Sequence, residues 1–437
     1  MLLRRSLIFD GLIAVAALGC VFGGSHLILT EGWLGGGLRA ITARYALVLL
    51  GLGLIASFTI KAEWRRKAVI TLTSLVTSIY AFEIASHLVS TFGTVKRRVP
   101  SVEDIVGIEV RAGNDIVPTL RPMNTFFNVS PNQVGSRIVV EGKETLVLSS
   151  IPFRRQVYCV RSGGEPVTHV ADRYGYRNPD ELWDAKRAQV VVLGDSFVRG
   201  TCVDDGETMV DALRRSFPRS LNLGTNGTGP LIALAALREY GAKMRPAAVI
   251  FALDPETDLG DDLNYEKKSP ILMKYLTFDY TQDLAGKRSE ITDVLTRFIA
   301  EQGFQNHGGK KNAFWSEVAT LRNWQGHLKT HYSRLLVRPD FELFGQIIRT
   351  MRDEAGTWGG RVYVLHVPSG RARRLDAKTS EVIKALGVDL VPGDDDWENL
   401  GENLFDQIDP WGGHFTPKGY RIIGEVIAGR LRRDGIE

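Results

Sequence analysis

This sequence has few cysteines and a small net charge. The 437 residues include three cysteines and eight histidines, and the formal net charge at pH 7 is only +4. The 54 basic residues do not gather into one long run, which argues against nucleic acid as a partner. Neither a cluster of metal ligands nor a nucleotide-binding loop is visible, so we expect no metal and no other cofactor. A chain of this length has room for two or three domains.

The longest apolar runs lie in the first 95 residues. They span roughly residues 7–29, 45–60 and 68–92, and each approaches or exceeds the roughly 20 residues that a helix needs to cross a bilayer. With the amino terminus in the cytoplasm, six Lys and Arg residues would flank these runs on the inner side and five on the outer side. We therefore expect residues 1–95 to form a multi-pass anchor in the lipid bilayer, with about three transmembrane helices and the rest of the chain outside the cytoplasm.

The first apolar run has a second interpretation. Arg4 and Arg5 precede it, and Leu18-Gly19-Cys20 faintly resembles a lipoprotein cleavage box, which would make the run a cleaved signal peptide. Apolar sequence continues past Cys20, and two more runs follow. The membrane anchor is therefore the interpretation that the sequence favours.

Residues 96–185 have a different pattern. Short β-forming runs, such as residues 136–141 and 144–148, are broken by Gly, Pro and Asn. We expect a small β-rich linker module here, and it contains no motif that indicates a chemistry.

The most informative segment of the sequence is an apolar run that ends on Gly194-Asp195-Ser196. β-Branched residues fill positions 190–192, and the run is short and stops at a turn signal, which predicts a buried strand. Gly194 permits a sharp bend, so Ser196 would lie at the carboxyl end of this strand. Open parallel sheets hold their functional groups at that edge.

Strands and helices alternate after Ser196. Helical spacing over residues 207–217 is followed by a strand that runs into the glycine-rich turn at 220–230, and then by a helix and a strand that ends at Leu253. A further helix and strand are expected at 341–356 and 361–367. This alternation predicts a parallel sheet with crossover helices.

Two consequences follow for the edge of this sheet. Ser196, the glycine-rich turn and Thr257 each follow a strand, so they should share one rim. The charged stretch at about 261–339 is longer than a crossover requires. We expect it to form a helical insertion beside that rim.

His414 is the histidine best placed to act as a base. It combines a loop position, a nearby upstream carboxylate and a following helix, which Thr416 would cap and Pro417 would begin. A serine hydroxyl is a weak nucleophile and needs an adjacent base that a third group orients. The sequence therefore predicts that Ser196 and His414 act together.

Four blocks of this sequence resemble the SGNH hydrolases, also called the GDSL family. They are Gly194-Asp195-Ser196-Phe197, the turn from Asn222 to Gly227, Glu256-Thr257-Asp258, and His414 before a Pro-x-Gly helix. They follow the order of the family over about residues 157–437. The chain looks most like membrane-anchored bacterial members, in which a Gly-Tyr-Arg-Asn-Pro segment, here Gly175 to Pro179, precedes the nucleophile strand. The resemblance implies a flavodoxin-like three-layer α/β/α domain over residues 186–437.

The resemblance also assigns catalytic roles. Ser196 would be the nucleophile and His414 its general base, and the backbone N–H groups of Ser196 and Gly227 would donate to the oxyanion. Thr257 replaces the Asn side chain that serves the family as third donor, so a hydroxyl must act there or the donor is lost. The acid usually lies three residues before the histidine, whereas Asp409 lies five before His414. Asp409 is the first candidate, Asp406 the second, and a Ser-His dyad with a backbone carbonyl is the third option.

The cysteines bear on the compartment. Cys20 lies inside the first apolar run, which leaves Cys159 and Cys202, the latter six residues after Ser196. Outside the cytoplasm these two could form a disulfide between the β-rich module and the catalytic loop, and two free buried thiols are the alternative.

These features together predict a serine-dependent enzyme of acyl-ester chemistry. The resemblance implies an esterase or deacetylase anchored in the bacterial inner membrane, with its catalytic domain on the periplasmic side and acylated cell-surface glycans as substrates. Transfer of the acyl group to a sugar hydroxyl would instead make it an O-acyltransferase, with a membrane acyl-donor partner. A non-catalytic glycan-binding protein is the third hypothesis, motivated by Thr257 and the displaced Asp409.

Overall fold

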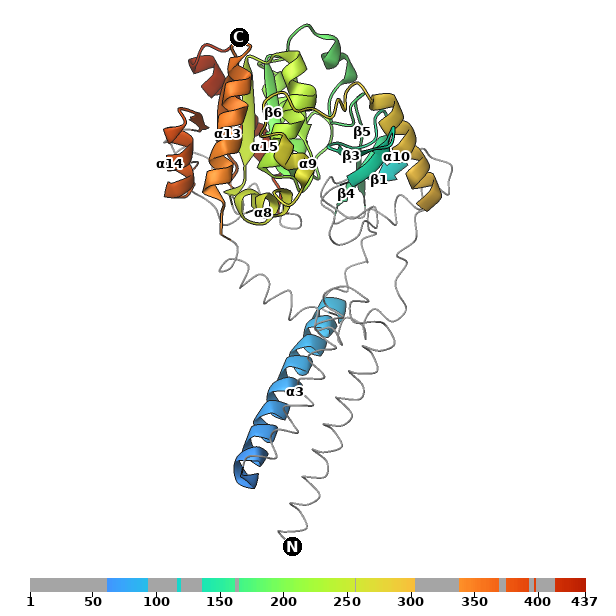
Figure 1. The fold of residues 1–437 in the computed structure, drawn as a ribbon, viewed down its shortest axis with the longest axis vertical. Helices are drawn as coiled ribbons and strands as arrows, with labels where there is room; N and C mark the ends of the chain where they lie inside the picture. Colours follow the sequence, from blue (N-terminus) through green and yellow to red (C-terminus); the bar gives the residue numbers. More distant parts are fainter. Residues whose placement is uncertain are drawn as a thin grey trace. The chain divides into compact units, whose positions relative to one another are not determined.

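A computed structural model describes residues 61–92, 116–118, 136–161, 165–255, 257–302, 338–368, 375–392, 397 and 413–437. The chain divides into two compact units, Met1–Arg97 with Gly309–Leu335, and Arg98–Gly308 with Leu336–Glu437. In the first unit, the part that the structure describes is helix α3, Ala62–Phe92, drawn in blue in Figure 1.

Helix α3 contains the third apolar run of the sequence, residues 68–92. Among the described residues, no helix combines the length and the apolar character that a membrane crossing requires. The runs at 7–29 and 45–60 lie outside the described residues, as does Cys20. The membrane anchor therefore stays a prediction from the sequence.

The second unit is built on a five-stranded sheet with the order β10-β9-β8-β6-β7. Strand β6 (Val190–Gly194) pairs in parallel with β7 (Ser220–Gly224) and β8 (Ala248–Leu253), and β9 (Arg361–His366) and β10 (Asp389–Val391) extend the sheet in the same direction. Counted along the chain from β6, this is the flavodoxin-like order 2-1-3-4-5. In this order the carboxyl ends of β6 and β8 form the switch point, where such sheets bind ligands.

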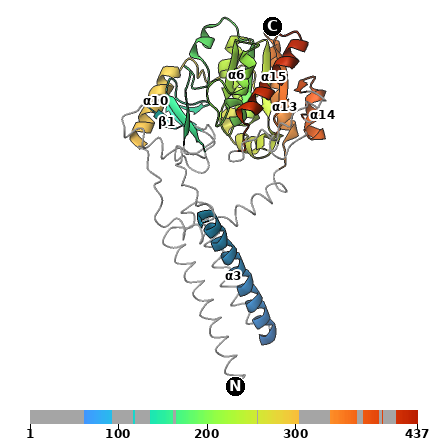
Figure 2. The ribbon, with the colours of Figure 1, turned by 180° about the vertical axis from the view of Figure 1, so that it is seen from behind.

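Helices cover both faces of this sheet. The side chains of Val191 and Leu193 pack in one apolar core with α7 (Pro230–Ala236) and α13 (Phe341–Gly356). Val190 and Val192 point to the other face and pack with α6 (Met209–Arg214) and α15 (Pro417–Arg433). Figure 1 shows α13 on one face of the sheet. Figure 2, which is seen from behind, shows α6 and α15 on the opposite face. The prediction of an α/β domain with a central parallel sheet is confirmed.

Two small sheets belong to the same compact unit. One has the order β1-β4-β5, in which β4 (Arg155–Val160) lies between β1 (Ile116–Pro118), which is parallel to it, and β5 (Pro166–Val170), which is antiparallel. The other is the antiparallel hairpin of β2 (Ser136–Val140) and β3 (Lys143–Val147). The two β runs expected at 136–141 and 144–148 are confirmed by this hairpin.

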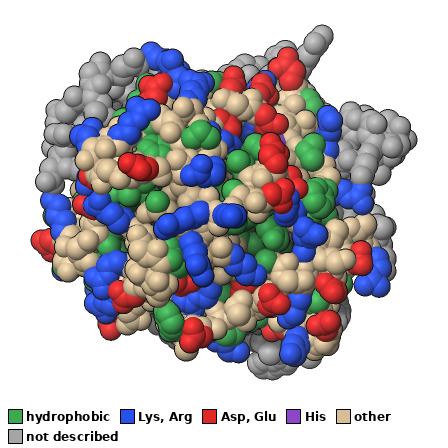
Figure 3. All heavy atoms as spheres, turned by 90° about the horizontal axis from the view of Figure 1, so that it is seen from above, with side chains coloured by type: hydrophobic (Ala, Val, Ile, Leu, Met, Phe, Trp, Pro, Cys, Tyr) green, Lys and Arg blue, Asp and Glu red, His purple; other side chains and the backbone are tan. Residues whose placement is uncertain are grey.

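The remaining elements are helices and helical turns. They are η2 (Asp180–Asp184), α5 (Ser196–Arg199), η3 (Leu237–Gly241), η4 (Ala242–Met244), η5 (Thr257–Asp262), α8 (Leu263–Glu266), α9 (Pro270–Lys274), α10 (Arg288–Gln302) and α14 (Ala377–Ala385). Over the surface seen from above in Figure 3, basic and acidic side chains are interspersed.

The insertion predicted at about 261–339 is described over residues 261–302 and 338–339, and the first of these ranges contains α8, α9 and α10. Two neighbouring residues of the π-helical turn η3 hold its segment 275–284. Arg238 donates to the carbonyl oxygens of Tyr275 and Thr277 and pairs with the Glu354 carboxylate at 2.7 Å. Glu239 accepts from the Tyr275 hydroxyl and from backbone N–H groups of the same segment. The turn η3 therefore binds both carbonyl and N–H groups of segment 275–284.

Candidate active site

Ser196 lies at the carboxyl end of the central strand β6. The strand is fully buried, because its valines face apolar cores on both sides of the sheet. At Gly194 the backbone has φ 151°, and a Cβ there would come within 2.7 Å of the Val198 side chain, so a glycine fits this bend. Asp195 caps the following helix α5 by accepting from Phe197 N at 2.9 Å. Ser196 is thus the first residue of a helical turn at the edge where the sequence placed it.

His414 comes from the far end of the chain and is anchored by its neighbours. The hydroxyl of Thr416 caps α15 by accepting from Gly419 N, and Pro417 begins that helix, as the sequence predicted. The next residue, Phe415, is buried, with its ring 5.3 Å from the ring of Phe197. The imidazole itself lies 4.8 Å from the Phe197 ring. Phe197, the residue after Ser196, therefore packs against both His414 and Phe415.

The two side chains meet. His414 Nε2 lies 2.8 Å from Ser196 Oγ, across a separation of 218 residues. The Asp195 carboxylate is the other acceptor near this hydroxyl, at 3.4 Å from Oδ2, which is too long to compete with the imidazole. An imidazole nitrogen at this distance can take the hydroxyl proton as oxygen attacks an electrophile. The pair has the geometry that nucleophilic catalysis requires.

The predicted third member of the triad is not among the described residues. Asp409 and Asp406 both fall in the range 398–412, which lies outside the described residues. Glu256 also lies outside them. The choice between Asp409, Asp406 and a backbone carbonyl therefore stays as the sequence left it.

The glycine-rich turn after β7 is bonded to the nucleophile strand. Thr225 N donates to the carbonyl oxygen of Gly194 at 3.0 Å, and Thr228 Oγ1 donates to the same oxygen at 3.2 Å. The turn between them contains Gly227, which is exposed, has φ 64° and would have open space around a Cβ. The N–H of Gly227 thus lies in an accessible turn that is fixed to the residue two before Ser196.

Thr257, the predicted third oxyanion donor, begins η5 just after β8 and is exposed. Its hydroxyl lies 3.5 Å from the carboxylate of its neighbour Asp258, at the outer limit of a hydrogen bond. No other hydrogen bond of this hydroxyl occurs within the part of the chain that the structure describes.

Buried carboxyl groups lie behind this rim. The Asp258 carboxylate accepts from Asp254 N at 2.8 Å. Burial raises the pKa of Asp195 to about 7, and the charges of Asp254 and Asp262 add to the effect. Burial also raises the pKa of Asp262 to about 7 and holds the pKa of Asp258 well above its usual range. This buried group was not predicted from the sequence, although residues 254, 258 and 262 repeat at the helical interval of four.

The Gly175 to Pro179 segment braces the loop after the nucleophile. Arg177 is buried and donates to the carbonyl oxygens of Gly200 at 2.8 Å and Val203 at 2.9 Å. Asn178 pairs with the edge strand β7, donating to Asn222 O at 2.9 Å and accepting from Asn222 N at 2.7 Å. This side-chain amide takes the place of a neighbouring strand, so the edge of the sheet beside the glycine-rich turn is covered.

The small sheet is covalently joined to the nucleophile loop. Cys159 on β4 and Cys202 form a disulfide, with the Cα atoms 5.3 Å apart. The buried guanidinium of Arg199, on the helix that Ser196 begins, donates to Gln156 Oε1 at 2.7 Å and lies 3.2 Å from His169 Nε2. Strands β4 and β5 therefore hold the residues that directly follow Ser196.

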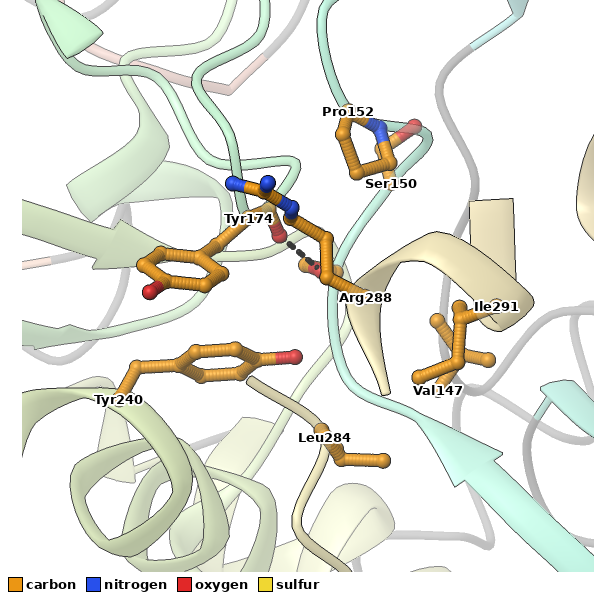
Figure 4. Close-up of a pocket in the computed structure, with 9 residues that line it drawn as sticks. Val147, Ser150, Pro152, Tyr174, Tyr240, Leu284, Arg288 and Ile291 are labelled. Carbon is orange, nitrogen blue, oxygen red and sulfur yellow. Dashed lines mark hydrogen bonds between the residues drawn. The ribbon is translucent and has the colours of Figure 1, made fainter. Parts of the chain in front are cut away.

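A separate pocket lies between β3, the segment around Tyr174, η3 and α10 (Figure 4). The rings of Tyr174 and Tyr240 lie 5.2 Å apart on one side, and Arg288 reaches over them from α10. Ile291, Leu284 and Val147 form its apolar part. Of the residues predicted for catalysis that the structure describes, none lines this pocket.

Comparison with known proteins gives similarity to solved structures alone. No protein-family model matches the chain, and no curated protein matches its sequence. The crystal structure of TesA shares 14% identity, covering 56% of this chain and 98% of that chain with a TM-score of 0.31. A lipase/acylhydrolase from Enterococcus faecalis shares 14%, covering 57% and 97% with a TM-score of 0.32. A GDSL-like lipase from Bacteroides thetaiotaomicron shares 13%, covering 59% and 91% with a TM-score of 0.26. Similarities of this size do not decide an activity, which depends on the residues of the site.

Proposed function

We propose that this chain is a serine-dependent acyl-ester hydrolase. The observation that carries the proposal is the 2.8 Å contact between Ser196 Oγ and His414 Nε2 at the switch point of a flavodoxin-like sheet. In the first step, Ser196 Oγ attacks the ester carbonyl carbon while His414 takes the hydroxyl proton. The tetrahedral intermediate then expels the alkoxide, which receives that proton from His414, and an acyl-serine remains.

The second half-reaction repeats these steps with another hydroxyl. His414 takes a proton from water, whose oxygen attacks the acyl carbon, and the acid is released as Ser196 regains its proton. A sugar hydroxyl in place of water would make the same pair an O-acyltransferase. The N–H groups of Ser196 and Gly227 are the proposed donors to the oxyanion in both halves.

The disulfide supports a site of action outside the cytoplasm. Structural disulfides persist in oxidising compartments and are rare in the cytosol. We propose a periplasmic catalytic domain on an inner-membrane anchor, with an acylated surface glycan as substrate, as the resemblance to membrane-anchored SGNH proteins implies. A non-catalytic glycan-binding role is the competing proposal, and the exposed, weakly bonded Thr257 hydroxyl is the observation that favours it.

A direct test uses the purified full-length chain with a fluorophosphonate probe and with p-nitrophenyl acetate. Ser196→Ala and His414→Ala should each abolish labelling and ester turnover, whereas Ser289→Ala, at an exposed serine of α10, should keep both. Adding an oligosaccharide acceptor then separates the two fates of the acyl group, because a transferase would form acyl-sugar in place of free acid. A folded wild-type chain that neither reacts with the probe nor hydrolyses the ester would reject the enzyme and favour the binding role.

A further inference from the structure

Asn226 is a buried amide without a hydrogen-bond partner. It lies in the turn after β7, and the residue is 6% exposed. Its carboxamide oxygen is buried and accepts no hydrogen bond, and the side chain makes none within the part of the chain that the structure describes. The neighbouring amides behave differently, since Asn178 and Asn222 both bond through nitrogen and oxygen. Because an unpaired buried amide costs free energy, Asn226 needs an explanation other than the stability of the turn.

The position of Asn226 indicates what that explanation is. The residue before it and the second residue after it, Thr225 and Thr228, both donate to the carbonyl oxygen of Gly194. Gly194 is two residues before Ser196, so the backbone on either side of Asn226 is fixed to the nucleophile strand. The next residue, Gly227, is exposed and has no atom near a hypothetical Cβ, which leaves room for a ligand beside the turn.

A donor is also needed at this rim. The negative charge of a tetrahedral intermediate requires preorganised hydrogen-bond donors, and the loss of one donor slows acyl transfer by roughly 100- to 1,000-fold. Thr257 would be a weak substitute, because it is exposed and its hydroxyl is nearest to the Asp258 carboxylate. An amide N–H that bonds to no other group is free to serve.

We propose that the side-chain amide of Asn226 donates a hydrogen bond to the carbonyl oxygen of the bound ester and strengthens that bond as the oxyanion forms. This inference rests on the proposed hydrolase function. Asn226 then acts next to the Gly227 N–H, so one turn supplies two donors. The substrate oxygen gives the amide N–H an acceptor, and Thr257 is not required as a donor.

The test compares Asn226→Ala and Asn226→Asp with Thr257→Ala in the purified full-length chain, using p-nitrophenyl acetate. Both Asn226 variants should lower kcat by about 100-fold with less than a threefold change in KM, because the lost bond strengthens in the transition state. Their labelling by the fluorophosphonate probe should slow in parallel. Thr257→Ala should keep most of the activity, and Asn264→Ala, which removes an amide that donates from α8 to Gly260 O, is the matched control.

The melting temperature separates this role from a structural one. The Asn226 amide makes no bond in the free protein, so Asn226→Ala should melt at or above the temperature of the wild type. A kcat within threefold of wild type in both Asn226 variants, or a loss of activity that follows a loss of fold, would overturn the proposal while leaving Ser196 and His414 in place. A wild-type chain inert toward both ester and probe would overturn the hydrolase proposal together with this one.

Discussion

Arg199 Nη2 donates to Gln156 Oε1 at 2.7 Å, which joins the helix that Ser196 begins to strand β4 of the small sheet. Both side chains are almost fully buried, and the amide nitrogen of Gln156 is itself bonded to Ile151 O. The position of the nucleophile thus depends on a contact between segments that are far apart in sequence. The small sheet is part of the support of the active site.

Arg199→Met should therefore reduce both stability and turnover. It leaves the buried Gln156 oxygen without its donor, which should lower the free energy of unfolding by about 2 kcal/mol. A shift of the serine should lower kcat by roughly 10- to 100-fold. Urea unfolding and p-nitrophenyl acetate kinetics measure the two effects, with Arg349→Met at an exposed position of α13 as control. Unchanged turnover in folded Arg199→Met would show that this contact does not position Ser196.

The Cys159–Cys202 disulfide should stabilise the domain by lowering the conformational entropy of the unfolded state. It closes a loop with a sequence separation of 43, for which chain entropy gives about 4 kcal/mol. Dithiothreitol should lower the denaturant midpoint of the wild type accordingly. The Cys159→Ser, Cys202→Ser double variant should unfold at that lower midpoint with or without reductant. A wild-type midpoint that does not respond to complete reduction, verified by thiol alkylation, would contradict this.

The parts that could be predicted from the sequence are those that local pattern determines. The valine run of β6, the amphipathic spacing of α13 and the Thr416 cap of α15 all appear at the expected residues. Their signals lie within one segment, as alternation of side chains, helical periodicity or capping chemistry.

The contacts that support the site could not be predicted in this way. The short strand β1 pairs with β4 nearly 40 residues away, and Arg199 and Gln156 are 43 residues apart. No single-sequence pattern links such segments, because the tertiary fold decides which edges and side chains meet. The unpaired amide of Asn226 was equally hidden, since an asparagine in a glycine-rich turn normally indicates only turn chemistry.

Glu239→Gln should loosen the described part of the insertion. The carboxylate accepts from Tyr275 Oη at 2.6 Å, Gln282 N at 2.6 Å and Leu284 N at 2.8 Å. An amide keeps one oxygen and turns a donor toward another donor, so hydrogen exchange at residues 280–285 should accelerate and stability should fall by about 1 to 3 kcal/mol. Glu290→Gln, at an exposed position of α10, is the control. Equal exchange in the two variants would show that Glu239 does not hold this segment.

Asp262→Asn should stabilise the protein in a pH-dependent way. Burial, together with the charges of Asp261 and Asp254, raises the pKa of Asp262 from 3.8 to about 7 in the folded chain. Between about pH 4 and pH 7 the folded state therefore holds a proton that the unfolded state has lost, so the stability of the wild type falls as pH rises through this window.

Above pH 7 the folded protein contains an ionised carboxylate in an unfavourable site, whereas the asparagine variant contains a neutral amide. Relative to the wild type, the variant should gain stability between pH 4.5 and pH 8, by up to about 3 kcal/mol. Urea unfolding at the two pH values measures this difference, and Asp279→Asn, which replaces an exposed carboxylate, is the control. A stability difference that is the same at both pH values would mean that Asp262 titrates normally and that the carboxyl groups behind the rim are hydrated.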